Sequence, residues 1–139
     1  MVEPKPENTG DPQLDEDESV QQARRVHIDR AEVAARWRRY ARSEECHARL
    51  MREAREQPFD QLRDTRAQVR RAAAELLAGQ QDIAEAARQM MARVQQLYIL
   101  EPPLLGFDEA MIAYTQARTW QACALELAPD LKPIQPCWN

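Results

Sequence analysis

Apolar residues recur every three or four positions along most of this chain, with polar residues between them. Such spacing places the apolar side chains on one face of an α-helix, and a regular alternation of three and four is the heptad pattern of coiled coils. It predicts a first helix over about residues 20–57, with Ser19 opening a capping box that reaches Gln22 and Pro58 ending the helix. The positions in this first series are Ala23, Val26, Arg30, Val33, Trp37, Tyr40, Glu44, His47, Met51 and Ala54.

A second and stronger series predicts a helix over about residues 60–100. Gly79 and the capping-box spacing from Asp82 to Glu85 would allow a break, but the unbroken heptad phase favours one continuous helix. The main row is Phe59, Leu62, Arg66, Val69, Ala73, Leu76, Gln80, Ile83, Ala87, Met90, Val94 and Leu97. A neighbouring row widens the apolar face in its last half and contains Leu77, Ala84, Met91 and Tyr98.

A third, shorter helix is predicted over about residues 109–127. Pro102 and Pro103 end the helix before it, and Asp108 is the expected cap. Small residues along its apolar face allow close approach to the second helix, with Trp120 as the one bulky anchor. This face contains Ala110, Ala113, Ala117, Trp120, Ala124 and Leu127.

These patterns predict an all-α fold: an elongated antiparallel helical hairpin or coiled coil with a shorter third helix and extended N- and C-terminal tails. A reversal at Pro58 gives both interrupted apolar faces a partner, which favours the hairpin over a single kinked rod. The helical domain is expected at residues 19–128. An acidic, proline-containing tail at 1–18 would precede it, and a proline-rich tail at 129–139 would follow.

Charge is unevenly distributed along the chain. The net charge of −4 combines a net −6 over residues 1–19, where seven acids face only Lys5, with a net +4 over residues 20–57, where ten arginines face six acids. The acidic tail could fold back on the basic first helix, but the favoured interpretation is a tail that simply keeps the protein in solution.

Large apolar residues are scarce, which points to protein partners. Leu, Ile, Val and Phe together account for 25 of 139 residues, so thin helices must pack closely or share a core with a neighbour. We therefore expect a non-enzymatic structural or adaptor subunit of a larger assembly, such as a cytoskeletal or axonemal lattice, a virion or a secretion-type complex. The predicted partner-binding residues are Arg36, Trp37, Arg39, Tyr40, Leu104, Leu105, Phe107, Trp120 and Trp138.

Two alternatives remain open from the sequence. The arginine-rich first helix, with Trp37 and Tyr40 among its cations, could bind nucleic acid. The acidic net charge and the placement of both aromatics on the apolar face argue against this. A free-standing homodimeric coiled coil is the other alternative, and an acidic protein surface would attract the same arginines.

Candidate chemistry is sparse, and we expect no enzyme, no cofactor and no metal. The adjacent pair Cys46-His47 points in directions about 100° apart on a helix, which does not suit a nucleophile and its base. No Cys-x2–4-Cys or His-x3–5-His element suggests zinc, and three cysteines do not indicate a disulfide framework. No signal region or membrane-length apolar run is evident, so a cytoplasmic location is expected, with the cytoskeleton or a virion as settings.

Overall fold

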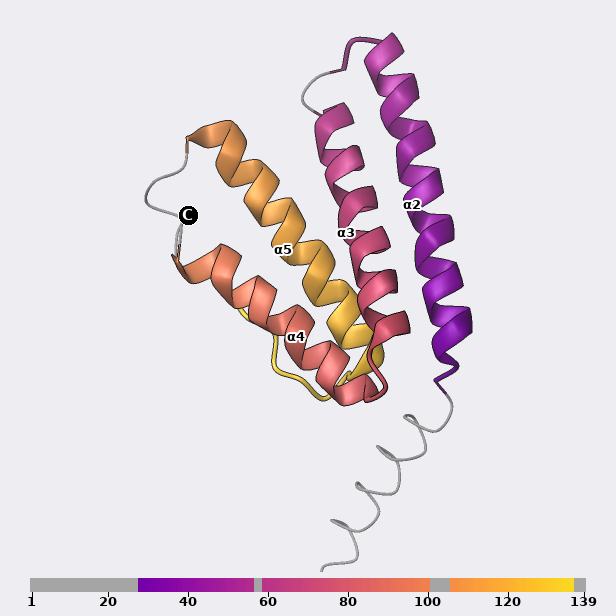
Figure 1. The fold of residues 1–139 in the computed structure, drawn as a ribbon. Helices are drawn as coiled ribbons and strands as arrows, with labels where there is room; N and C mark the ends of the chain where they lie inside the picture. The colour runs from indigo at the N-terminus through magenta and orange to yellow at the C-terminus, as the bar shows by residue number, and fades with distance from the viewer. Residues whose placement is uncertain (1–27, 57–58, 101–105, 137–139) are drawn as a thin grey trace, which may run out of the picture.

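The computed structural model describes residues 28–56, 59–100 and 106–136, and all regular structure in these ranges is helical. The elements are α2 (Arg30–Glu53), α3 (Phe59–Gly79), α4 (Ile83–Gln95), a π-helical turn η1 (Gln96–Leu100) that continues α4, and α5 (Phe107–Leu127). The predicted all-α fold and the antiparallel hairpin of the first two helices, α2 and α3, are confirmed (Figure 1). A second hairpin, formed by α4 and α5, packs against the first.

The helix predicted over residues 20–57 is interrupted at Ile28 and Asp29, which are not helical. Asp29 has extended backbone (φ −92°, ψ 106°), and its Oδ1 accepts the Glu32 amide proton at 3.2 Å, so α2 starts at Arg30. Asp29 and Glu32 have the spacing of a capping box, in which an oxygen-bearing side chain satisfies an amide of the first helical turn. A single helix from residue 20 is therefore wrong. The predicted cap at Ser19 and the tail at 1–18 lie outside the described residues.

The predicted continuous helix over residues 60–100 is also wrong. It is broken after Gly79, and α4 restarts at Ile83, where Asp82 Oδ1 accepts the Ala84 amide proton at 3.0 Å. Glycine is a poor helix former and aspartate a good cap, so the local sequence favours the break. Continuous heptad phase is misleading here because both segments direct their apolar faces into the same core.

The third helix is two residues longer than predicted at its start. Its N-cap position is Gly106, which offers no side-chain cap, and Asp108 lies in the first turn beside the positive end of the helix dipole. The helix ends at Leu127 as predicted, and its apolar face is buried as expected at Ala113, Ala117 and Trp120.

The tip of the α2/α3 hairpin begins with a Schellman motif, a standard way of ending a helix. The Glu56 amide donates to the Met51 carbonyl at 2.8 Å and the Arg55 amide to the Arg52 carbonyl at 3.1 Å. Arg55 has φ 59°, in the left-handed region that glycine usually occupies. The motif ends α2 before Pro58, which lies outside the described residues.

The hydrophobic core lies where the two hairpins meet: it joins the start of α2 to the second halves of α3 and α5, and it continues along α4 into η1 (Figure 1). It combines a few large side chains with many fully buried alanines, so the helices approach one another closely. Its buried members are Val33, Ala34, Trp37, Val69, Ala73, Ala74, Leu77, Ala86, Ala87, Met90, Val94, Tyr98, Ala117, Trp120, Cys123, Ala124, Leu127 and Ala128.

The contact face of α2 differs in part from the predicted series. Val33 and Trp37 are buried as expected, but Ala41 and Ala48 are fully buried where the pattern favoured Tyr40 and His47, which are exposed. Alanine at these positions lets α2 lie close to α3, and the larger side chains next to them are excluded from the contact.

The proline-rich tail has no regular secondary structure over residues 132–136, and it folds back on the helices. Leu131 and Ile134 pack against the core, and the Ile134 amide donates to Gln121 Oε1 at 2.7 Å. This part of the tail is therefore attached to the molecule's own bundle.

Candidate binding surfaces

Trp37, predicted to bind a partner, is a core residue instead. Its side chain is fully buried, and its indole Nε1 donates to Glu126 Oε1 at 2.9 Å, which joins α2 to the end of α5. Glu126 also accepts a hydrogen bond from Arg36, and this interaction raises the pKa of the Arg36 guanidinium. Arg36 and Trp37 thus serve the fold, and Trp37 is removed from the candidate partner surface.

Trp120, which was also predicted to bind a partner, is buried as well. It is only 6% exposed, and the Arg93 guanidinium covers its ring at 4.9 Å from the centroid, so a partner could not reach most of the indole. The sequence identified both tryptophans as bulky anchors, but they anchor the bundle itself. Because the chain has few large apolar residues, both tryptophans are needed to fill its own core.

The remaining predicted partner-binding residues divide into two groups. Arg39, Tyr40 and Phe107 are exposed and stay available. The others are Leu104, Leu105 and Trp138, which lie outside the described residues.

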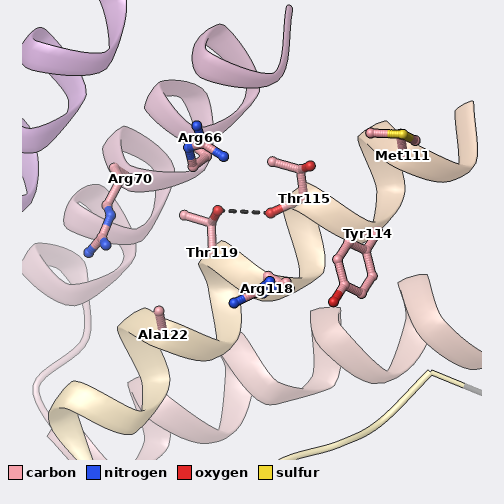
Figure 2. A pocket seen from close by; sticks show the side chains of 8 residues that line it. All are labelled: Arg66, Arg70, Met111, Tyr114, Thr115, Arg118, Thr119 and Ala122. Atoms are coloured by element: carbon pink, nitrogen blue, oxygen red, sulfur yellow. Dashed lines mark hydrogen bonds between the residues drawn. The ribbon is translucent and has the colours of Figure 1, made fainter. Parts of the chain in front are cut away.

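A basic groove runs between α3 and α5 and has a volume of about 410 Å³. Arg66 and Arg70 on α3 stand opposite Thr115 and Thr119 on α5 (Figure 2). The complete lining is Arg66, Arg70, Met111, Tyr114, Thr115, Arg118, Thr119 and Ala122.

A second hollow, of about 450 Å³, lies between α2 and α3 and shares Arg70 with this groove. Its lining is Tyr40, Ser43, Glu44, His47, Arg63 and Arg70. We call the two together the basic surface. Four arginines and one glutamate line it, a net charge of +3 with histidine neutral.

Two arginines of the basic surface rest on tyrosine rings. The Arg70 guanidinium lies 5.0 Å from the ring centroid of Tyr40, and that of Arg118 lies 5.6 Å from the centroid of Tyr114. Arg70 also donates to Cys123 Sγ at 3.6 Å. Neither arginine pairs with a carboxylate within the described part of the chain, so their charge is available to an incoming anion. Sequence inspection favoured the first helix for such a role and missed these arginines on α3 and α5.

The outer half of the α2/α3 hairpin is held mainly by ion pairs. Glu44 accepts from Arg63 Nη1 at 2.7 Å and from Arg66 Nε at 2.6 Å. Two further pairs cross the hairpin: Arg71 with Glu45, through two bonds of 2.8 Å, and Arg52 with Asp64 at 2.7 Å. Bonds between charged partners are stronger than neutral ones, although exposure reduces their net contribution.

The ionisation of Glu44 makes the stability of this hairpin depend on pH. Burial alone would raise its pKa, but the hydrogen bonds and charges of Arg63 and Arg66 outweigh burial and lower the pKa below the ordinary value. A carboxyl group with a lower pKa in the folded state stabilises the fold above its unfolded pKa, and that stabilisation is lost as pH falls through the folded pKa.

We therefore expect Glu44→Gln to reduce the free energy of unfolding by about 1 kcal/mol at pH 7. The difference from wild type should shrink as pH falls below about 4, because Glu44 is then protonated first in the unfolded state and, at still lower pH, in the folded state as well. Urea unfolding at pH 7 and pH 3 measures the loss of stability and its decrease at low pH. Glu75→Gln, an exposed glutamate on α3, is the control and should change little. An undiminished Glu44→Gln effect at pH 3 would contradict the assignment.

The cysteines and the histidine within the described ranges occupy different environments. Cys46 and His47 are exposed on α2, whereas Cys123 is buried, and burial raises the pKa of its thiol to about 12. A thiol with so high a pKa is a poor nucleophile. Within the described ranges, no three His, Cys, Asp or Glu side chains gather closely enough to hold a metal ion. None of the helices described has the length and apolar character that a bilayer span requires.

Large apolar side chains are exposed near the end of α2 and at the starts of α3 and α5. Leu50 is 60% exposed near the end of α2, and the first residues of α3 and α5, Phe59 and Phe107, are 55% and 76% exposed. Figure 1 shows that α2 ends, and α3 and α5 begin, at this same end, where the two hairpins diverge. We call these three residues the apolar end.

No protein-family model, curated protein or solved structure matches this chain. The chemistry of its own surfaces is therefore the guide to its function.

Proposed function

We propose that this protein is a non-enzymatic structural or adaptor subunit that binds protein partners in a larger assembly. Cytoskeletal, virion and secretion-type complexes are the settings to which a thin, all-helical chain of this kind is suited. The apolar end is the observation that carries the proposal.

Exposed apolar residues on a soluble protein are ordinary when they are scattered, but grouped ones favour an interaction site. Leu50 lies near the end of α2, and Phe59 and Phe107 are the first residues of α3 and α5; these three helix ends point to the same end of the molecule (Figure 1). Phenylalanine brings a large apolar area with few rotatable bonds, which suits the centre of a protein interface. The chain is short of large apolar residues, so three of them in solvent are costly unless a partner covers them.

The test compares two triple variants of the tagged full-length chain in pull-downs from the native source. The first, Leu50→Ser with Phe59→Ser and Phe107→Ser, removes the apolar end. The matched control is Ala72→Ser with Ala78→Ser and Ala92→Ser, three exposed alanines elsewhere on α3 and α4. Because all six side chains are largely exposed, we expect both variants to keep wild-type helicity.

We expect wild type and control to recover the same stoichiometric partners after nuclease treatment, and the apolar-end variant to lose them at least tenfold. Equal recovery by all three proteins would refute the role of this surface. If wild type recovers only itself, and sedimentation shows a dimer that the apolar-end variant lacks, the protein is a self-associating homodimer and the adaptor proposal fails.

A further inference from the structure

We propose that the basic surface is a docking site for acidic peptide segments, and that the chain's own residues 1–19 occupy it in the free protein. The proposal rests on the charged residues that line the basic surface, and none of the three residues of the apolar end is among them.

Charge complementarity is the first argument. Four arginines and one glutamate line the basic surface, a net charge of +3. Residues 1–19 contain seven acids and one lysine, a net charge of −6, and four of the acids are consecutive at residues 15–18. Opposite charges brought together in a groove attract more strongly than they would on an open, fully solvated face.

The state of the arginines is the second argument. Arg63 and Arg66 already share Glu44, but Arg70 and Arg118 lie on tyrosine rings and pair with no carboxylate within the described ranges. An aromatic ring does not neutralise the charge of a guanidinium beside it, so both arginines can still donate to an incoming carboxylate. The hydroxyl-bearing side chains of Thr115 and Tyr114 line the same groove.

The third argument is that the acidic segment is long enough to reach the basic surface. Arg30 donates to the Gln81 carbonyl, so the start of α2 lies beside the end of α3. Gly79 is the last residue of α3, and Arg70 lies nine residues before it, which is about 14 Å along the helix axis. Glu18 and Ile28 are ten positions apart, a distance along the chain that can span up to about 33 Å when extended. The acidic run can therefore reach Arg70 without any change in the helices.

The occupant is tethered, which distinguishes it from an acidic segment of another protein. A short tether holds a segment at an effective concentration of the order of millimolar, so even weak ion pairs keep it in place. Any acidic partner would then have to displace residues 1–19, and the tail would act as a built-in competitor.

The test adds a fluorescently labelled peptide of residues 1–19 to full-length proteins at low ionic strength and measures anisotropy. In one protein the seven tail acids are replaced by the corresponding amides, which removes the tethered competitor. We expect the added peptide to bind this variant at least tenfold more tightly than it binds wild type. Binding should weaken with added salt.

Two further variants locate the site on the neutralised-tail background. Arg70→Gln with Arg118→Gln should lower peptide affinity about tenfold. Arg42→Gln with Arg49→Gln makes the same change of net charge on the exposed face of α2 and should stay within about twofold. Equal losses in the two would mean unspecific charge attraction and would overturn the proposal, as would no binding to the neutralised-tail protein.

Two results would assign the surface to another occupant and so overturn the proposal. In the first, a labelled single-stranded oligonucleotide binds wild type more tightly than the peptide binds the neutralised-tail protein, and Arg70→Gln with Arg118→Gln abolishes this binding. In the second, wild type self-associates and the neutralised-tail variant is monomeric, which would show that the tail occupies the groove of a second copy.

Discussion

Replacing Trp37 with alanine should destabilise the protein by about 3–5 kcal/mol. The indole is fully buried between the hairpins, and its N–H donates to Glu126, so the substitution creates a cavity and removes the bond that joins α2 to α5. The stability of a domain this small is commonly about 5–15 kcal/mol, so the loss would be a large part of the total.

Urea unfolding followed by circular dichroism measures this effect. Trp37→Phe is the informative control, because it keeps most of the apolar area but lacks the donor to Glu126, and it should cost clearly less. A loss below about 1 kcal/mol for Trp37→Ala would show that Trp37 is not a central core residue.

Enlarging a buried alanine should have the next largest effect. Ala117 is fully buried on α5, in a core that also holds Ala86 and Ala87 of α4. A leucine at position 117 has no space and would push the helices apart, so we expect Ala117→Leu to cost about 1–3 kcal/mol.

Ala122→Leu is the matched control because it makes the same substitution at an exposed position of α5. Its effect should stay within about 0.5 kcal/mol, since alanine and leucine have similar helix propensities. Thermal unfolding of wild type and the two variants measures these changes in stability. Equal stability of both would mean that the alanine-rich contact is loosely packed.

The hairpin and the buried face of α5 could be predicted from sequence because each depends on local spacing. The alternation of apolar residues and the expected reversal near Pro58 were enough to pair the first two helices. On α5, five of the six positions expected to be apolar contacts, from Ala113 to Leu127, are buried. Periodicity identifies such faces directly.

The helix boundaries that were missed also had a local signal. Asp29 and Glu32 have the same capping-box spacing as Asp82 and Glu85. Both aspartates cap a helix in the structure. The sequence interpretation gave more weight to the continuous heptad spacing than to these caps. Heptad spacing shows which residues face the core, but it does not show whether the helix is continuous.

The candidate surfaces could be predicted less well, because burial depends on which helices meet. Trp37 and Trp120 have the residue type of an interface anchor, and nothing local shows that α5 and α4 cover them. The groove is also non-local: Arg70 and Arg118 are 48 positions apart in sequence and meet only because α5 packs against α3. Glu126, which joins α2 to α5, gives no sequence signal of this role.

The uneven placement of the core has a consequence for how the molecule opens. Near the start of α2 the helices share large side chains, whereas the outer half of the α2/α3 hairpin depends on alanine contacts and cross-hairpin ion pairs. Local unfolding of that outer half breaks few apolar contacts, so it requires less free energy than unfolding of the whole chain. Backbone amides at the hairpin tip should therefore exchange with solvent deuterium long before those around Trp37. The protein would lose its structure in two stages, starting from the tip.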